Sequence, residues 1–242
     1  MKYVFLLCTC MLFSLFSCQD PIETESAKAL EAYQSGDYQK AIDLNQKVLD
    51  LDSNSTASIV TYYNLSVIYR EQQQWQKAAE PLLKIINIDS SEVNAYADLG
   101  LVYLELEQLD LSIEYSTRAL GFGAENPYSN ANLAVAYRLK GSYEKAMTYS
   151  NIALSFDSTN IKALDNLAIV CESQGLLQAA IKYHEKVLMY DSTHIQTYPV
   201  LSNLYGSTAA ADKAIEYGEK ALVLFPDEIN MINNMGFIYL EL

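Results

Sequence analysis

Few side chains in this sequence could perform acid–base or metal chemistry, because the 242 residues include only two histidines and four cysteines. His184 and His194 have no other His and no Cys close by, so we interpret both as single surface histidines. The segment 50–54 has acidic residues at calcium-ligand spacing, but Ser55 and Thr61 stand where a calcium loop needs Gly and Glu. No glycine-rich phosphate loop or nucleophile motif is present. We therefore predict a chain that is not an enzyme, with no metal ion or cofactor, and infer no small-molecule substrate.

The N-terminus has the pattern of an export signal. Lys2 precedes an apolar run from Tyr3 to Phe16, which is shorter than the roughly 20 residues that a membrane-spanning helix needs. A polar break follows directly, which predicts a signal segment over residues 1–17. Three of the four cysteines lie in the first eighteen residues. Cys171 in the body therefore has no disulfide partner there, and we interpret it as a small buried hydrophobic residue.

The sequence Leu15-Phe16-Ser17-Cys18 resembles the lipobox of bacterial lipoproteins, with a bulkier residue than usual at Phe16. The resemblance implies lipid attachment to Cys18, cleavage before it, and a mature chain 18–242 anchored in the bacterial cell envelope. Gln19 in place of Asp implies sorting to the outer membrane. Two or more acyl chains hold a protein stably on a membrane. An ordinary cleaved signal with an incidental Cys, or a retained membrane anchor, are the alternatives.

The charge of the chain limits its partners. Thirty acidic residues against sixteen basic ones give a formal charge of −14. Nucleic-acid affinity comes largely from Lys and Arg that displace counterions, so we predict no nucleic-acid partner. The same charge argues against direct adhesion to anionic lipid headgroups.

The body of the chain is built from a repeat of about 34 residues. A first set of small residues has successive spacings of 37 and then four times 34: Ala41, Ala78, Ser112, Ala146, Ala180 and Ala214. A second set lies twelve residues earlier in each copy: Ala29, Ser66, Gly100, Ala134, Ala168 and Ser202. A third position is mostly Tyr: Tyr69, Tyr103, Tyr137, Cys171, Tyr205 and Tyr239. Such a period predicts stacked supersecondary units that bury their apolar faces against one another.

This pattern resembles the tetratricopeptide repeat (TPR) family. The resemblance implies an all-α fold, a right-handed superhelical solenoid of antiparallel helix hairpins, in which the small residues mark close helix crossings. We call the two helices of each hairpin helix A and helix B. The predicted hairpins are 22–58, 59–92, 93–126, 127–160, 161–194 and 195–228, followed by a partial repeat, 229–242.

The turns and linkers have their own signals. Gly36-Asp37-Tyr38 and Gly141-Ser142-Tyr143 predict a helix stop and restart within a hairpin. Four linkers carry Asp-Ser, which we expect to cap the following helix: Asp52-Ser53, Asp89-Ser90, Asp157-Ser158 and Asp191-Ser192. In the first hairpin Glu25 and Lys28 replace residues that are apolar in later copies, as expected of a solvent-facing end repeat.

The family resemblance also implies a concave groove lined by the helices A. Its aliphatic spine and mixed-charge rim fit an extended or helical peptide or a protein partner. The alternative is that curvature of the solenoid buries these aliphatic residues between repeats. The candidate partner-binding residues are Tyr63, Val67, Arg70, Leu101, Tyr128, Val135, Arg138 and Ile169.

These features together predict a membrane-tethered scaffold that binds a peptide or protein partner in the cell envelope. A role in envelope assembly follows only by analogy with other tetratricopeptide lipoproteins. The alternative is the N-terminal sensory or regulatory region of a longer chain truncated at residue 242.

Overall fold

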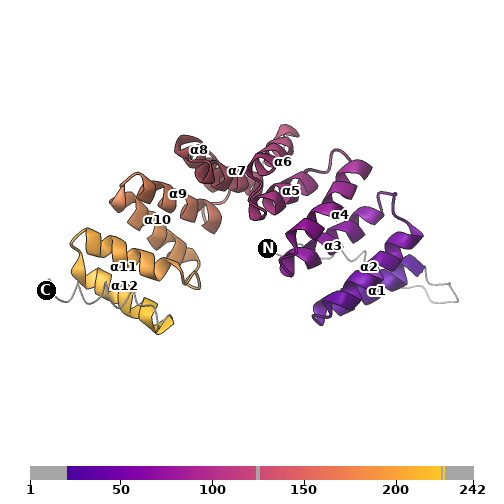
Figure 1. Ribbon diagram of the computed structural model, residues 1–242, viewed down its shortest axis with the longest axis horizontal. Helices are drawn as coiled ribbons and strands as arrows, with labels where there is room; N and C mark the ends of the chain where they lie inside the picture. The colour runs from indigo at the N-terminus through magenta and orange to yellow at the C-terminus, as the bar shows by residue number, and fades with distance from the viewer. Residues whose placement is uncertain (1–20, 124–125, 225, 227–242) are drawn as a thin grey trace. The chain divides into compact units, whose positions relative to one another are not determined.

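The computed structural model describes residues 21–123, 126–224 and 226, and this part of the chain consists of α-helices joined by short turns. The signal segment, Cys18 and the predicted partial repeat 229–242 lie outside the described residues. Figure 1 shows the helices in chain order. They are α1 (Pro21–Gln34), α2 (Tyr38–Leu51), α3 (Ser58–Glu71), α4 (Trp75–Ile88), α5 (Val93–Glu105), α6 (Leu109–Gly121), α7 (Pro127–Leu139), α8 (Tyr143–Phe156), α9 (Ile161–Ser173), α10 (Leu177–Tyr190), α11 (Thr197–Ser207) and α12 (Ala211–Leu224).

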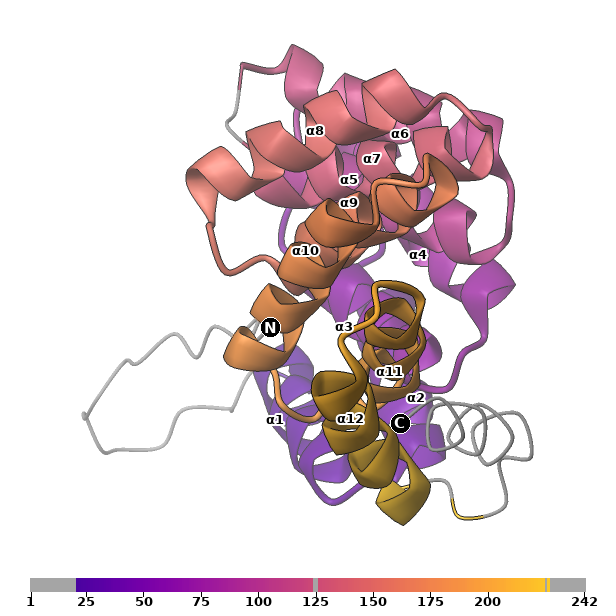
Figure 2. The ribbon, with the colours of Figure 1, turned by 90° about the vertical axis from the view of Figure 1, so that its left-hand side faces the viewer.

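The helices fall into two compact units. The N-terminal unit ends at Gln108 and contains α1 to α5, and the C-terminal unit begins at Leu109 and contains α6 to α12. In each unit a helix packs on the helix before it and on the helix after it. Figure 2 shows one such hairpin, α11 and α12 in gold, facing the viewer. The helical fold predicted from the repeat is confirmed.

The turns within hairpins are closed by one residue in the left-handed conformation. Gly36 and Gly141 have φ of +79° and +73°, as predicted for helix stops. At the first turn the amides of Gly36 and Asp37 donate to the carbonyls of Tyr33 and Ala32, at 3.0 and 2.9 Å. This pair of bonds is the Schellman motif, which satisfies carbonyls that a helix end leaves without partners. Three other turns place a residue with a side chain in this conformation: Gln73, Glu107 and Ala209.

The prediction for the Asp-Ser linkers was wrong about which helix the aspartate serves. Asp52, Asp89 and Asp191 follow the last residue of a helix B, and each carboxylate accepts from the amide two residues further on, inside the linker. They form Asx turns that end one helix, and none caps the next. The linker residues that do cap are asparagines: Asn126 accepts from the amide of Ser129 at 2.9 Å, and Asn160 from that of Ala163 at 3.0 Å.

Five of the small residues in the first set lie where helices A and B of one hairpin cross, as the spacing predicted, and Ser112 is equally buried in α6. All six have no accessible surface: Ala41, Ala78, Ser112, Ala146, Ala180 and Ala214. The Ser66 hydroxyl in α3 donates to the carbonyl of Ala78 in α4 at 3.1 Å, and Ser202 in α11 donates to that of Ala214 in α12 at 2.8 Å. A side chain on one helix therefore reaches the backbone of the other, which leaves room for small residues only.

The recurrent tyrosines pack within hairpins. Tyr137 stacks on Tyr149 and Tyr205 on Tyr217, with ring centroids 5.5 and 5.7 Å apart. Cys171, in the same register, is buried as predicted, and burial raises the pKa of its thiol. This position therefore contributes to the core.

The first hairpin has a more exposed surface than the others. Lys28 is solvent-exposed and pairs with Glu25 at 2.6 Å, as expected of an end repeat. The hydroxyls of Tyr33 and Tyr38 donate to the two oxygens of Glu71 at the end of α3, at 2.5 and 2.8 Å. Burial and the Glu71 carboxylate raise the pKa of Tyr33 to about 12. Glu71 thus fastens the end hairpin to its neighbour.

Candidate functional site

Four of the predicted groove residues lie in the N-terminal unit. Tyr63, Val67 and Arg70 follow one another along α3, and Leu101 lies in α5. The Tyr63 hydroxyl donates to Glu92 Oε1 at 3.2 Å. Val67 and Leu101 are both half-buried.

Arg70 links two consecutive helices A. Its Nη1 lies 3.1 Å from Asp98 Oδ1 in α5, and both side chains are less than one-third exposed. Burial raises the pKa of the Asp98 carboxyl, and Arg70 opposes this effect. An ion pair that is partly removed from water holds its geometry and is screened little by salt.

The other four groove residues lie in the C-terminal unit. Tyr128 is exposed at the start of α7, and Val135 and Ile169 are half-buried in α7 and α9. Arg138 Nε donates to Asn166 Oδ1 in α9 at 2.7 Å. Burial lowers the pKa of the Arg138 guanidinium, with Asp165 opposing. Asn166 in turn donates from Nδ2 to the Ser150 hydroxyl in α8 at 2.8 Å, so three helices share one hydrogen-bond chain.

These two contacts are copies of one feature, which we call the inter-repeat rung. In each copy an Arg on one helix A reaches a polar residue 28 positions later, on the next helix A: Arg70 to Asp98, and Arg138 to Asn166. Sequence reasoning missed the rung. Its signal was the recurrence of Arg near the end of helix A together with Asn or Asp early in the next one. Spacing alone does not show that these two positions meet.

The four aliphatic groove residues are neither fully accessible in a groove nor fully buried between repeats. Val67, Leu101, Val135 and Ile169 are all half-buried. Part of each side chain packs against the protein, and part stays accessible to a ligand. Each unit therefore presents an apolar strip beside a fixed polar rung.

His184 was predicted to be a surface residue, and this prediction was wrong. Its side chain is buried in α10, with Nε2 2.7 Å from Glu172 Oε1 and Nδ1 3.9 Å from Asp165 Oδ1. His184 lies one helical turn after the small residue Ala180, so it faces inward like the residues at the same place in other hairpins. The repeat register alone therefore predicts a buried side chain at His184. His194 is half-buried and bonds through Nδ1 to Thr197 Oγ1 at 2.7 Å.

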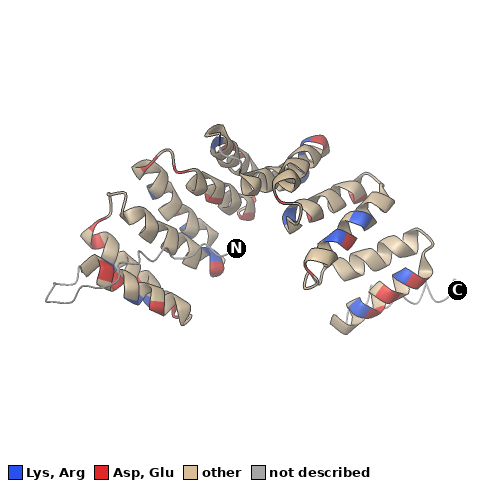
Figure 3. Cartoon of the chain, turned by 180° about the vertical axis from the view of Figure 1, so that it is seen from behind, with Lys and Arg blue, Asp and Glu red and all other residues tan. Residues whose placement is uncertain are grey.

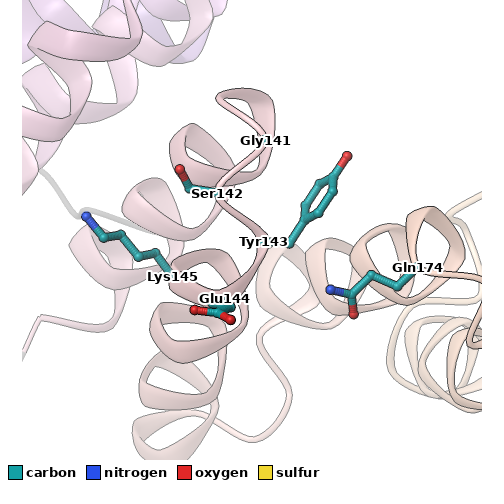
Figure 4. Close-up of a pocket in the computed structure, with 6 residues that line it drawn as sticks. All are labelled: Gly141, Ser142, Tyr143, Glu144, Lys145 and Gln174. Carbon is teal, nitrogen blue, oxygen red and sulfur yellow. The ribbon is translucent and has the colours of Figure 1, made fainter.

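One shallow hollow of about 390 Å³ lies at the hairpin turn between α7 and α8. Figure 4 shows its lining: Gly141, Ser142, Tyr143, Glu144, Lys145 and Gln174. Lys145 lies over the Tyr137 ring, 4.9 Å from its centroid. None of the predicted groove residues lines this hollow, and its lining offers no nucleophile held beside a base.

Within residues 21–123, 126–224 and 226, no helix is both long and apolar enough to span a bilayer. In that same part of the chain no group of three or more His, Cys, Asp or Glu side chains is arranged to hold a metal ion.

Comparison with known sequences identifies the repeats. Tetratricopeptide-repeat family models match residues 93–122, 127–160 and 163–195. The chain is also 31% identical to Protein unc-45 homolog B of Xenopus laevis over 77 residues. That match spans 32% of this chain and only 8% of the relative.

Comparison with solved structures identifies the fold. The type IV pilus biogenesis factor PilW superposes with a TM-score of 0.75 at 17% identity, covering 92% of this chain and all of PilW. Pseudomonas aeruginosa pilF gives 0.73 at 16% identity, covering 92% and 98% of the two chains. YrrB, described as a TPR protein with an unusual peptide-binding site, gives 0.56 at 20% identity, covering 78% and 96%. The chain therefore contains tetratricopeptide repeats, and its described helices have the all-α fold of TPR proteins.

Proposed function

We propose that this chain is a protein–protein interaction scaffold that holds a peptide or protein segment on the exposed faces of its helices A. The observation that carries the proposal is the combination of an apolar strip with a fixed rung, which is clearest in the C-terminal unit. There Val135 and Ile169 remain partly accessible beside Arg138 and Asn166. The same combination recurs in the N-terminal unit.

The chemistry of the strip and the rung suits a polypeptide. Half-buried aliphatic side chains can take apolar residues of a partner, because covering their remaining surface removes it from water. A guanidinium has five N–H donors in a fixed plane, so the use of Nε for Asn166 leaves Arg138 with donors for a peptide carbonyl. A rung that is already hydrogen-bonded is also pre-organised, which reduces the entropy lost on binding.

The proposed place of action is the bacterial cell envelope, with a lipid on Cys18 as tether and the outer membrane as destination. The structural likeness to PilW and pilF supports an envelope assembly role, and the likeness to YrrB supports a peptide ligand. These likenesses concern the fold, and the assignment to this chain is our proposal.

Charge introduced into the strip tests the binding face. The double variant Val135→Asp, Ile169→Asp should lose the partners captured by crosslinking in the native envelope, because two carboxylates cannot be covered by apolar side chains. The matched control is Thr148→Asp, Gln178→Asp, which adds the same charge at exposed positions of two helices B. Circular dichroism should show helix content unchanged in both variants. Capture that survives in the strip variant would place the partner elsewhere.

The tether is tested independently. Cys18→Ala should move the protein from the membrane fraction to the soluble fraction, because two or more acyl chains are needed for stable anchoring. Mass spectrometry of the membrane form should show the lipid mass on the peptide that begins at Cys18. A Cys18→Ala protein that stays with the membrane would contradict the lipid anchor without affecting the binding face.

A further inference from the structure

His184 is a buried imidazole that lies between two carboxylates. It belongs to α10 and is only 2% exposed. Its Nε2 lies 2.7 Å from Glu172 Oε1, and its Nδ1 lies 3.9 Å from Asp165 Oδ1. Both acids belong to α9 and are about two helical turns apart, so each meets a different nitrogen of the ring. This arrangement suits a ring that carries a proton on each nitrogen.

The two protonation states of this imidazole differ by one hydrogen bond. A neutral ring carries one proton, which Nε2 donates to Glu172. Nδ1 is then a buried atom without a hydrogen-bond partner. A doubly protonated ring donates from both nitrogens, and Asp165 is the carboxylate that lies within 4 Å of Nδ1. The Asp165 side chain is 30% exposed, so it has solvent on one side and can move to close this contact to a hydrogen bond.

The other titratable groups around α10 are engaged elsewhere. This helix packs on α9 and α11. On α10 itself Lys182 and Lys186 are exposed. In α9 and α11 the remaining titratable side chains have other partners or lie in the core: Lys162 donates to Asn132, Tyr198 donates to Ser192, Tyr205 bonds to Glu185 and Lys213, and Cys171 is buried.

Asp165 also lies beside the inter-repeat rung. The next residue, Asn166, accepts from Arg138 Nε at 2.7 Å. The Asp165 carboxylate opposes the effect of burial on the pKa of the Arg138 guanidinium, so its charge acts on that cation as well. Asp165 therefore lies between a buried imidazole and a cation of the proposed helix A face.

We propose that His184 is a proton-operated switch of the helix A face in the C-terminal unit. A proton taken up from solvent at Nδ1 forms a hydrogen bond to Asp165, whose charge then compensates the imidazolium and compensates Arg138 less. Arg138 attracts the carboxylates of a bound segment more strongly in that state, so acidic segments bind more tightly as the pH falls. Imidazole is the side chain whose ordinary protonation changes between pH 5 and pH 8. The effect on binding rests on the proposed function, whereas the switch is a property of the chain alone.

Nuclear magnetic resonance of the full chain labelled with ¹⁵N tests the switch without a partner. Between pH 8 and pH 5 the His184 ring should change from one protonated nitrogen to two, and the Arg138 Nε–H resonance should move with the same midpoint. Asp165→Asn should abolish the movement at Arg138 while His184 still titrates, because the carboxylate is the link between them. A His184 ring that keeps a single proton down to pH 5, or an Arg138 resonance that moves equally in Asp165→Asn, would overturn the inference.

The second histidine of the chain supplies the control. His194 is half-buried and bonds to Thr197 Oγ1, away from the rung. His194→Gln should leave the response of Arg138 unchanged, and His184→Gln should abolish it. The fold favours the charged form of His184 in this proposal, so its stabilising effect is present at low pH and is lost as the pH rises. The thermal midpoint of the unchanged chain should therefore exceed that of His184→Gln by about 2–4 °C more at pH 6 than at pH 8. A larger difference at pH 8 would contradict the proposal.

A capped Leu-Glu-Leu peptide tests the effect on binding. Titrated into the full chain, it should shift the Arg138 Nε–H resonance with an affinity about threefold higher at pH 6 than at pH 8, as expected for one added charge about 7 Å away in water. A capped Leu-Gln-Leu peptide should show no such change. Equal affinity of the Glu peptide at both pH values would overturn the inference and leave the proposed function standing. A peptide that shifts neither Arg138 nor Val135 and Ile169 at either pH would count against the helix A face, and not against the titration of His184.

Discussion

The α4 and α8 helices occupy the same place in two hairpins, one in each unit, and they fill it in opposite ways. The inward stripe of α4 is Ala78, Leu82 and Ile85, whereas that of α8 contains only small residues. Two further helices B of the C-terminal unit resemble α8: α6 with Ser112, Ser116 and Ala119, and α12 with Ala214, Gly218 and Ala221. The fourth helix B of that unit, α10, buries Ile181 and Val187 and so resembles α4. The fold therefore accepts either a bulky or a small inward stripe on helix B.

In α8 a polar group takes the place of a bulky side chain. Ser150 in α8 accepts from Asn166, and this hydrogen bond stands where Leu82 packs in α4. Within the described residues, the buried side-chain atoms that lack a hydrogen-bond partner are all in the C-terminal unit: Ser116 Oγ, Ser129 Oγ and His184 Nδ1. A buried polar group without a partner costs about 1–3 kcal/mol. The comparison shows that the repeat tolerates either an apolar or a polar contact at this place on helix B.

Charge is also divided unequally between the two units. Residues 21–108 contain fourteen Asp and Glu against six Lys and Arg, and residues 109–224 contain twelve against nine. Figure 3 shows where these residues lie on the helices. Most of the net negative charge of the described chain thus belongs to the N-terminal unit.

Removal of the bulk in α4 should have the largest effect. Leu82 has no accessible surface, so Leu82→Ala should lower the free energy of unfolding by about 3 kcal/mol through lost transfer energy and a cavity. Urea unfolding followed by circular dichroism measures the change. The matched variant Ser150→Ala should cost roughly 1 kcal/mol, because it removes one hydrogen bond and no bulk. Equal costs would show that the inward contacts of α4 and α8 do not differ as described.

A larger side chain among the small inward residues of α8 should have the next largest effect on stability. Ala146 is fully buried, so Ala146→Leu should cost roughly 1–3 kcal/mol by overpacking. Thr148→Leu, at an exposed position of the same helix, is the control and should stay within about 0.5 kcal/mol. A stable Ala146→Leu protein would mean that helices A and B can separate at this crossing, contrary to the close contact inferred from burial.

Loss of the rung should have a smaller effect. Asn166→Ala removes the acceptor of Arg138 and the donor to Ser150, which should cost roughly 1–2 kcal/mol. A double-mutant cycle with Ser150→Ala should give a coupling energy above about 0.5 kcal/mol, since the two residues share one hydrogen-bond chain. Strict additivity would indicate that the chain is not cooperative.

Acid should affect the N-terminal unit through the Asx turns. Hydrogen bonds from Ser55 lower the pKa of Asp52, and those from Ser91 lower the pKa of Asp89. A lowered folded-state pKa contributes stability that is complete above the unfolded value of about 4 and is lost as the pH falls through the folded value. Asp52→Asn, Asp89→Asn should flatten the acid limb of the thermal midpoint below about pH 4, because the variant lowers the midpoint at pH 7 and leaves it nearly unchanged in strong acid. An unchanged acid limb would remove these turns from the pH response.

The sequence predicted those features that close packing imposes on every repeat. Small residues at the helix crossings were identified because no larger side chain fits there, and Cys171 was identified from its register. The sequence did not predict which amides the Asp52 carboxylate bonds, because a linker aspartate can accept from amides in the linker or at the start of the next helix. The rung between Arg138 and Asn166 depends on how consecutive helices A are rotated, and spacing along one chain does not fix that rotation. The buried place of His184 was available from the register and was overlooked.

The left-handed turn residues have a consequence for engineering. Gln73, Glu107 and Ala209 adopt a backbone conformation that glycine adopts freely, and an L-residue pays roughly 1–2 kcal/mol for it. Ala209 has no polar side chain to offset that cost by bonding to its own backbone. Replacing it with glycine is therefore a route to a more heat-resistant protein that leaves the proposed helix A face untouched.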